Sequence, residues 1–451
     1  MDAIAVETRP WKPPAEVLSA FADEAETCAF LSGGQGPRAR WSYLMRRPVE
    51  RLVIHRGAIA QAFEALRAML ARFGSARLED GPPFQGGVAG LAGYELGDRI
   101  EALGLAEHAD GWPDLAAFAY VSLLAFDHQR GEVLAIGRGD QPDEAQARAS
   151  DAAGWLAHAG RTGRTGPLVP TFETATSAAA YEAAVADVVA RIHDGEIFQA
   201  NIARIWTGRL VEGATPFDLL SRLVGDSPAP FAGWLRLGDR VLVSNSPERF
   251  ITVEPGPGRR IETRPIKGTR PRGADPQADA VLAAALMASD KDRAENLMIV
   301  DLMRNDLARV SPPGSVETPE LFALESFANV HHLVSTVTAR LAPGLDAADL
   351  LAAAFPPGSV TGAPKVQAMK VIAGHEPPRG PYCGSLFWAG GDGGFDSSVL
   401  IRSVAFVRDD GWRLEARAGA GIVADSDPLA ERLETEAKID ALRRALTGSV
   451  A

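Results

Sequence analysis

The sequence predicts an α+β fold whose sheets are mainly antiparallel. Two hairpins follow one another closely, because strand-like segments 231–237 and 240–245 flank a Gly-Asp turn and segments 249–255 and 259–265 flank a Gly-Pro-Gly turn. Segments with helical periodicity lie between groups of strands and do not alternate with them one by one. Such an arrangement is typical of α+β folds rather than of parallel α/β folds.

The first part of the chain contains one predicted helix, over 58–73, and a strand-like apolar run over 117–127. A stretch rich in Gly, Thr and Pro at 158–177 has no helical periodicity and is interpreted as a linker. It divides the 451 residues into an N-terminal region, 1–160, and a C-terminal region, 170–447.

The C-terminal region opens with a predicted helix over 177–196. Its apolar residues are spaced four, three and four apart, as on one face of a helix: Tyr181, Val185, Val188 and Ile192. The next predicted strand, 197–208, is expected to have a mostly apolar side formed by Phe198, Ala200, Ile202 and Ile205. Further along, the sequence predicts helices between 275 and 308 and from Lys365 to Ile372, and strands over 381–390, 397–407 and 412–418.

The composition is that of a globular protein, since 46% of the residues are hydrophobic and 23% are charged. No apolar run reaches the roughly 20 residues that cross a bilayer, and the first residues lack an apolar signal segment, so a cytoplasmic location is expected. The net charge of −12 argues against nucleic acid as the main partner. Cys28 and Cys383 are expected to be packing residues rather than part of a disulfide or zinc site.

A basic segment, 264–273, occurs within this acidic chain. Its cationic residues are Arg264, Lys267, Arg270 and Arg272. A small anionic ligand would need local cations in a protein of this net charge, and the segment is one candidate source. A solvated loop is the alternative interpretation.

Two predicted helices each carry acidic residues three positions apart, so that each pair shares one helical face. Asp292 and Glu295 form the first pair, and Glu431 and Glu434 form the second, with Lys438 one turn beyond. If the fold brought the two pairs together, their carboxylates could hold a hard dication such as Mg²⁺. Either pair alone is equally typical of a solvated helix surface.

Glycine-rich strings at 355–365 and 418–428 offer backbone N–H groups that could bind a carboxylate or a phosphate. Neither string matches the Walker A or the Rossmann pattern. Several single residues, considered in isolation, favour structural roles: His332 as a core histidine, Tyr382 in packing, Arg402 at the surface and Glu248 in a turn.

Nine segments, taken in sequence order from about residue 178 to 445, resemble the successive motifs of the chorismate-utilising enzymes. This family includes anthranilate, aminodeoxychorismate, isochorismate and salicylate synthases. The segments read IFQANIAR, SNSPERF, RPIKGTRPRG, AENLMIVDLMRNDLARV, VHHLVS, PPGSVTGAPK, YCGSLFWAG, FDSSVLIRS and AGAGIVADSDPLAERLETEAK. The N-terminal segment PPFQGGVAGLAGYELGDRIE is similar, less specifically, to the N-terminal region of the first two enzymes.

The resemblance implies a two-layer sandwich of two large, mainly antiparallel sheets with helices outside, and it implies that the N-terminal region joins this sandwich. It also implies an Mg²⁺ site made by Glu295 and Glu434, with Asp292 and Glu431 beside them. Glu248 is implied as the general acid that protonates the leaving C4 hydroxyl of chorismate. The remaining implied substrate contacts are backbone N–H groups of Gly419, Ala420 and Gly421 for the ring carboxylate, Tyr382 and Arg402 for the enolpyruvyl carboxylate, and Thr361, His332 and Lys438 around them.

Gln199 and Lys267 together indicate which reaction of the family to expect. Isochorismate and salicylate synthases carry a lysine base where this chain has Gln199, and anthranilate synthases carry an alanine where it has Lys267. The pair is typical of the aminodeoxychorismate synthases, whose lysine is a covalent nucleophile. The neighbouring Arg264, Arg270 and Arg272 are expected to lower the pKa of Lys267 by like-charge repulsion.

The implied reaction converts chorismate and ammonia to 4-amino-4-deoxychorismate, an early step toward 4-aminobenzoate and folate. The chain shows no glutaminase signature, so ammonia is expected from a separate glutamine amidotransferase subunit. One alternative is anthranilate synthase component I activity. A non-catalytic subunit that activates a glutaminase is the other, and it is disfavoured because every implied catalytic position carries competent chemistry.

Overall fold

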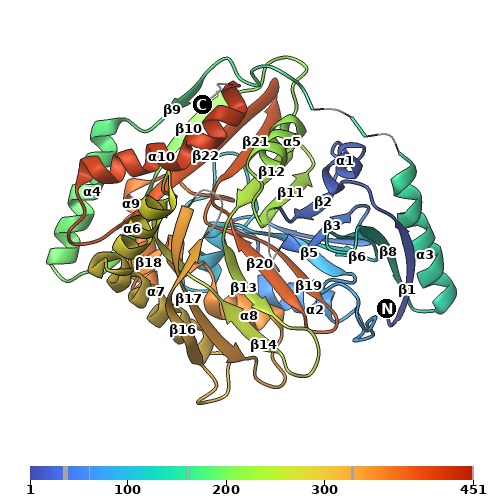
Figure 1. Ribbon diagram of the computed structural model, residues 1–451. Helices are drawn as coiled ribbons and strands as arrows, with labels where there is room; N and C mark the ends of the chain where they lie inside the picture. Colours follow the sequence, from blue (N-terminus) through green and yellow to red (C-terminus); the bar gives the residue numbers. More distant parts are fainter. Residues whose placement is uncertain (34–38, 60, 159, 162, 327–329, 449–451) are drawn as a thin grey trace.

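Two large β-sheets with helices outside them form the computed structural model, which describes residues 1–33, 39–59, 61–158, 160–161, 163–326 and 330–448 (Figure 1). All strand pairings in these ranges are antiparallel, as the hairpin signals predicted. One core lies between the two sheets and contains residues of both, such as Leu123 and Leu242 from the first and Phe118 and Leu386 from the second. Separate cores lie between each sheet and its outer helices.

The first sheet has 12 strands within the described ranges. Their spatial order is β1 (Ala3–Pro10), β8 (Glu132–Gly139), β7 (Ser122–Asp127), β3 (Trp41–Met45), β2 (Cys28–Leu31), β11 (Phe231–Leu237), β12 (Arg240–Ser246), β21 (Ser403–Asp409), β22 (Gly411–Ile422), β10 (Gln199–Arg209) and β18 (Gly362–Ala363), with β9 (Phe172–Thr174) also on β10.

The second sheet has 10 strands in the same part of the chain. Their order is β15 (Ile266–Pro271), β17 (Val330–Arg340), β14 (Arg260–Thr263), β13 (Arg249–Val253), β20 (Phe395–Val399), β19 (Ser385–Gly390), β5 (Gly87–Ala92), β6 (Leu115–Tyr120) and β4 (Glu50–Ile54), with β16 (Glu317–Ser326) also on β17.

The helices cover the outer faces of the sandwich, with α4, α6, α7, α9 and α10 gathered on one side of the molecule and α1 and α3 on the other (Figure 1). Their bounds are α1 (Pro14–Ser19), α2 (Ala62–Leu70), α3 (Pro142–Gly154), α4 (Ala178–His193), α5 (Pro216–Asp226), α6 (Pro276–Met287), α7 (Asp290–Ala308), α8 (Ala347–Ala354), α9 (Lys365–His375) and α10 (Pro428–Thr447). Short 3₁₀ helices are η2 (Tyr94–Arg99), η3 (Trp155–Ala157) and η4 (Gly358–Val360).

Helix α4 confirms the periodicity of its sequence. The side chain of Ser177 caps it by accepting a hydrogen bond from the backbone N–H of Ala180, and Tyr181, Val185 and Val188 are buried. The following strand corrects one expectation, because Phe198 is 68% exposed, whereas Gln199 is fully buried. Strand β10 begins at Gln199, so Phe198 lies before the strand and its side chain does not follow the in–out alternation of the strand.

Two segments that the sequence predicted as single strands are each two strands in different sheets. Segment 117–127 ends β6 of the second sheet and forms β7 of the first, and segment 397–407 ends β20 of the second sheet and begins β21 of the first. Strands β6 and β7 are buried on both faces, so segment 117–127 is almost continuously apolar and does not mark where the chain crosses between sheets. In segment 397–407 the crossing falls at the polar residue Arg402.

The N-terminal region contributes strands to both sheets. Strand β2 pairs with β11 of the first sheet, and β5 pairs with β19 of the second. The stretch interpreted as a linker is mostly exposed where it is described but is anchored at Leu168, which is fully buried and whose backbone N–H donates to the carbonyl of Leu446 at 2.7 Å. Residues 159 and 162 of that stretch lie outside the described residues.

The longest helix, α10, carries charged residues throughout, and no helix in the ranges given above is long and apolar enough to span a membrane. Cys28 and Cys383 are both buried free thiols, which confirms their expected packing role. Burial raises the pKa of each thiol and disfavours the reactive thiolate.

Candidate active site

Residues from both sheets meet where β10 and β22 of the first sheet face β15 of the second. A Cβ atom placed on Gly421 of β22 would lie 3.1 Å from Lys267 Nζ and 3.3 Å from Gln199 Nε2. A side chain at this position would crowd both Lys267 and Gln199. The structure therefore brings Gln199 and Lys267 together, although 67 residues separate them in the sequence.

The ammonium group of Lys267 lies in a buried and highly charged environment. Burial lowers the pKa of Lys267, and repulsion by Lys438 lowers it further, whereas Glu295, Glu248 and Glu434 raise it. The balance lowers the pKa, so the neutral amine is populated more than for an exposed lysine. A neutral amine beside a substrate is a competent nucleophile.

The expectation that the neighbouring arginines lower the pKa of Lys267 is not supported, since they are not among the main causes of its shift. The largest like-charge effect on Lys267 comes from Lys438, from a segment far away in the sequence. Each arginine instead has a carboxylate partner, which offsets its charge: Arg264 with Glu325 at 2.6 Å, Arg270 with Asp292 at 2.8 Å and Arg272 with Asp279 at 2.7 Å.

Glu248 lies in the turn between β12 and β13, and the Ser246 side chain holds this turn. The Ser246 hydroxyl accepts from the Glu248 backbone N–H at 3.2 Å and donates to the carbonyl of Val399 at 2.6 Å. Ser359 Oγ donates to Glu248 Oε1 at 2.8 Å. Burial raises the pKa of Glu248 to about 7, although Ser359, Lys267 and Lys438 each lower it. A carboxyl with this pKa can hold a proton near neutral pH and donate it.

The two acidic pairs lie on α7 and α10 and are close enough to influence one another. Burial raises the pKa of Glu295, and repulsion from Asp292 and Glu431 raises it further. Burial likewise raises the pKa of Glu431, and Glu434 adds to this effect. Only Glu431 of these residues is buried, and the Glu434 side chain is 51% exposed. Carboxylates close enough to repel one another form a donor set that suits a hard dication.

Cations of the chain itself offset these carboxylates in this conformation. Lys438 Nζ lies 2.5 Å from Glu434 Oε1, and Lys291 Nζ lies 4.0 Å from Glu431 Oε1. Within the described ranges, no three His, Cys, Asp or Glu side chains form a cluster that could hold a metal ion. The acidic residues thus fit Mg²⁺ by their chemistry and mutual repulsion, while a four-carboxylate cluster stays a prediction.

The glycine string 419–421 forms one edge of the site. Strand β10 pairs with it, but β21 pairs with β22 only as far as Ala416, so one edge of the string has no strand beside it. Backbone N–H groups on such an edge are available to a carboxylate. Lys438 Nζ donates to the carbonyl of Gly419 at 2.8 Å, which holds the string against α10.

Tyr382 and Arg402 lie at the same end of the site. A Cβ atom on Gly419 would be 3.0 Å from the Tyr382 hydroxyl oxygen. Arg402 has a φ of +54°, an uncommon backbone conformation for a residue with a side chain, and its guanidinium donates to the carbonyl of Lys438. Burial lowers the pKa of Arg402, whereas Tyr382 and Glu434 raise it, so all three side chains act on one another.

The other two residues that the sequence singled out are held by hydrogen bonds. Thr361 is fully buried, and its Oγ1 donates to the carbonyl of Pro357 at 2.8 Å. His332 Nδ1 lies 2.9 Å from Thr269 Oγ1, and burial lowers the pKa of its imidazole, which favours the neutral form. Thr269 and Lys267 lie on the same strand, β15, so His332 stands beside the strand that carries the lysine.

Sequence reasoning missed two polar residues of this region. Ser359 contacts Glu248 directly, and its place inside the glycine-rich string 355–365 was a signal that could have found it. Asn201 is 6% exposed and follows Gln199 by two positions on the same face of β10. The Asn201 side-chain oxygen and both polar atoms of the Gln199 side chain have no hydrogen-bond partner in the structure, although they are buried.

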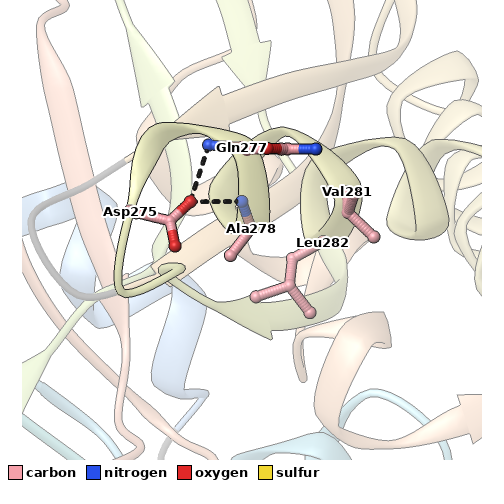
Figure 2. Close-up of a pocket in the computed structure, with 5 residues that line it drawn as sticks. All are labelled: Asp275, Gln277, Ala278, Val281 and Leu282. Carbon is pink, nitrogen blue, oxygen red and sulfur yellow. Dashed lines mark hydrogen bonds between the residues drawn. The ribbon is translucent and has the colours of Figure 1, made fainter.

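A cavity of about 520 Å³ lies elsewhere, on the outer face of α6 (Figure 2). Its lining residues are Asp275, Gln277, Ala278, Val281 and Leu282. Figure 2 shows the Asp275 carboxylate turned toward the backbone N–H groups of Gln277 and Ala278, which it caps. None of the residues discussed above lines this cavity, so it is distinct from the site.

The raised pKa of Glu248 predicts a pH-dependent cost in stability. Between pH 4.5 and about 7 the folded protein retains a proton that the unfolded chain has lost, so the free energy of unfolding falls as pH rises through this window. Glu248→Gln removes the titration. We expect the free energy of unfolding of this variant, relative to that of the parent protein, to rise by up to about 3 kcal/mol between pH 5 and pH 8. Denaturant unfolding of both proteins at pH 5 and at pH 8 measures this change. The same difference in free energy of unfolding at the two pH values would contradict the raised pKa of the buried Glu248.

Three comparisons bear on the identity of the chain. A model of the chorismate binding enzyme family matches residues 26–444. Aminodeoxychorismate synthase component 1 of Klebsiella aerogenes is 45% identical over 375 residues, which cover 81% of this chain and 78% of that protein. Anthranilate synthase component 1 of Aeropyrum pernix is 40% identical over 336 residues, 74% of this chain and 72% of that protein.

The solved structure of anthranilate synthase component I from Streptococcus pneumoniae has the same fold. Its TM-score is 0.79 at 28% sequence identity, and the match covers 91% of this chain and 93% of that one. This confirms the predicted sandwich of two large antiparallel sheets. The family match extends over most of the chain, from just before β2 into α10, and the chain belongs to the family of chorismate binding enzymes.

Proposed function

We propose that the protein is an aminodeoxychorismate synthase component, which converts chorismate and ammonia to 4-amino-4-deoxychorismate and water. The observation that carries this proposal is the buried Lys267 amine, which lies beside Gln199 and within electrostatic range of Glu248. A relative that is 45% identical bears this name and supports the proposal. The reaction would precede formation of 4-aminobenzoate and folate.

In the first step, the neutral Lys267 amine attacks ring carbon C2. The C2–N bond forms, both ring double bonds shift along the ring toward C4, and the C4–O bond breaks; the second step reverses this shift. Glu248 gives its proton to the departing C4 hydroxyl, so that water leaves rather than hydroxide. A pKa of about 7 lets Glu248 hold that proton at neutral pH in the absence of substrate.

In the second step, ammonia attacks C4 and the bond between C2 and Lys267 breaks. The lysine leaves as a neutral amine, and the new C4 ammonium returns one proton to the Glu248 carboxylate. Both residues are then in their starting forms, and one difficult substitution has been divided into two easier ones. Gln199 has no basic group, so it cannot activate water at C2 as a lysine in its place would.

The carboxylates of chorismate need positive or hydrogen-bonding partners in this acidic protein. We assign one of them to Tyr382 and Arg402 and the other to the unpaired edge of 419–421, with Lys438 beside it. Thr361 and His332 would border the ring. A bound Mg²⁺, held by Glu295 and Glu434 with Asp292 and Glu431 nearby, would neutralise a substrate carboxylate.

The ammonia is expected from a glutamine amidotransferase subunit that forms a heterodimer with this chain. The name of the Klebsiella relative, component 1, is consistent with a second component. Within the chain, we propose that region 170–447 carries the chemistry and that region 1–160 completes the sandwich. A cytoplasmic location remains a prediction.

Product identification with ammonium as the nitrogen donor tests the proposal. The purified chain is incubated with chorismate, Mg²⁺ and ammonium, with and without a lyase that releases pyruvate from 4-amino-4-deoxychorismate. We expect 4-aminobenzoate only when the lyase is present. Anthranilate without added lyase would instead establish the second candidate function, anthranilate synthase, which the 40% identical relative from Aeropyrum pernix supports. No product in either tube would favour a non-catalytic, glutaminase-activating subunit.

Removal of single acidic side chains is expected to weaken Mg²⁺ binding. Glu295→Gln and Glu434→Gln each remove one negative oxygen donor, so the dissociation constant for Mg²⁺ should rise by at least about tenfold. Isothermal titration calorimetry measures it without relying on activity. Asp440→Asn is a matched control, because Asp440 lies on the same helix as Glu434 but pairs with Arg444 at 3.1 Å and not with a group of the site. Equal affinity of all variants would contradict the assignment.

A further inference from the structure

Ser359 is the one side chain that forms a hydrogen bond to the Glu248 carboxyl within the described residues. Its Oγ donates to Glu248 Oε1 at 2.8 Å, and both residues are more than 90% buried. Oε2 accepts no hydrogen bond in the same part of the chain. The two oxygens of Glu248 are therefore not equivalent.

The position of Ser359 is itself closely fixed. It lies in η4, and the residues on either side of it are anchored: the carbonyl of Val360 accepts from Arg379 Nη1 at 3.1 Å, and Thr361 Oγ1 donates to the carbonyl of Pro357. Gly358 packs against Leu302 of α7 so closely that a Cβ atom there would lie 2.5 Å from Leu302 Cδ2. The backbone that carries Ser359 is thus held in place close to Glu248.

We propose that Ser359 is a positioning residue that keeps the acidic proton of Glu248 on Oε2, the oxygen that donates it to the departing hydroxyl. An oxygen that carries a proton is a poor acceptor, so the Ser359 hydrogen bond favours the form in which Oε1 is the carbonyl oxygen. Because the same bond stabilises the carboxylate more than the acid, it also holds the pKa of Glu248 below the value that burial alone would set.

The charged groups that face Glu248 come from other elements. Lys267 from β15 and Lys438 from α10 both lower its pKa, and they remain in place when Ser359 is changed. Removal of the hydroxyl should therefore leave the lysine contributions intact and shift the Glu248 titration in one direction only, toward higher pH.

The test compares Ser359→Ala, Ser359→Thr and the parent protein by infrared spectroscopy across pH. The reporter is the carbonyl band of the protonated Glu248 carboxyl, identified as the band that Glu248→Gln lacks. We expect this band to persist to higher pH in Ser359→Ala, and Ser359→Thr, which keeps a hydroxyl, to restore most of the parent titration. Thermal unfolding establishes that each variant is folded.

Kinetics with chorismate and a constant concentration of free ammonia provide the second measurement. Ser359→Ala should lower kcat by about tenfold, a part of what general acid catalysis contributes, with little change in the KM for chorismate, and should move the alkaline limb of the kcat profile to higher pH. Ser315→Ala is the matched control, since the Ser315 hydroxyl donates only to Pro312 of its own turn.

A parent-like titration of the Glu248 band in folded Ser359→Ala would overturn the proposal, whether or not activity falls. The inference rests on the proposed function only in naming the C4 hydroxyl as the proton acceptor. The infrared titration of Glu248 does not depend on the proposed function. If the parent protein formed a different product, the proposed function would fail while the spectroscopic result on Ser359 would still stand.

Discussion

Lys267→Ala should abolish the formation of 4-amino-4-deoxychorismate, with a loss in kcat of about 10³-fold or more, the scale seen when enzymes lose a covalent nucleophile. The reason is that no other side chain of the site offers a neutral amine. Gln199 beside it has none, and Lys438 is engaged by Glu434 and by the carbonyl of Gly419. The rate is measured with ammonium and a pyruvate-releasing lyase.

Mass spectrometry separates a nucleophile from a residue that only supplies charge. The parent protein, quenched with chorismate during turnover, should gain the mass of chorismate minus water on the peptide that contains Lys267, and Lys267→Ala should not. Lys370→Ala is the matched control, because Lys370 lies on the exposed side of α9. Unchanged product formation by Lys267→Ala would eliminate the covalent route.

Glu248→Gln is expected to lower kcat by about 10²- to 10⁴-fold, the usual contribution of a general acid. Glutamine preserves the size of the side chain and can still accept from Ser359, but it has no acidic proton, so the C4 hydroxyl would have to leave as hydroxide. In the parent protein, kcat should decline above about pH 7, as Glu248 loses its proton.

Steady-state kinetics at pH 6, 7 and 8 with constant free ammonia measure this effect. Glu254→Gln controls for the loss of a surface charge, since the Glu254 side chain is 59% exposed. The expected KM for chorismate changes little in either variant. A Glu248→Gln enzyme with parent-like kcat and the same alkaline limb would show that another group protonates the leaving oxygen.

Much of the fold was predictable because its local signals agree with the final structure. The spacing of Tyr181, Val185 and Val188 predicts α4, and the two turns around 238–239 and 256–258 predict the hairpins β11–β12 and β13–β14. The crossing between sheets within 117–127 was not predictable, because strands buried on both faces carry no alternation that changes at the crossing. The crossing within 397–407 falls at Arg402, a polar residue that could have indicated it.

The basic segment 264–273 of the site is another feature that its local sequence did not explain. Its local sequence suggested that the arginines adjust the lysine, because they are its nearest cations along the chain. The structure pairs them with acidic residues from β16, α7 and α6, and the cation that repels Lys267 comes from α10. The cations nearest to Lys267 along the chain were thus not the ones with the largest effect on it in the folded protein.

By itself, the sequence determined which chemical groups the site can use and in what order they occur. It indicated the family through nine motifs, and two residues, Gln199 and Lys267, carried the prediction of the reaction. Only the tertiary structure decided how those groups behave. Burial lowers the pKa of Lys267 and raises that of Glu248 to about 7, and Ser359 contacts one oxygen of that carboxyl. These properties depend on burial and on charges brought in from distant segments, and neither is encoded in the residues adjacent along the chain.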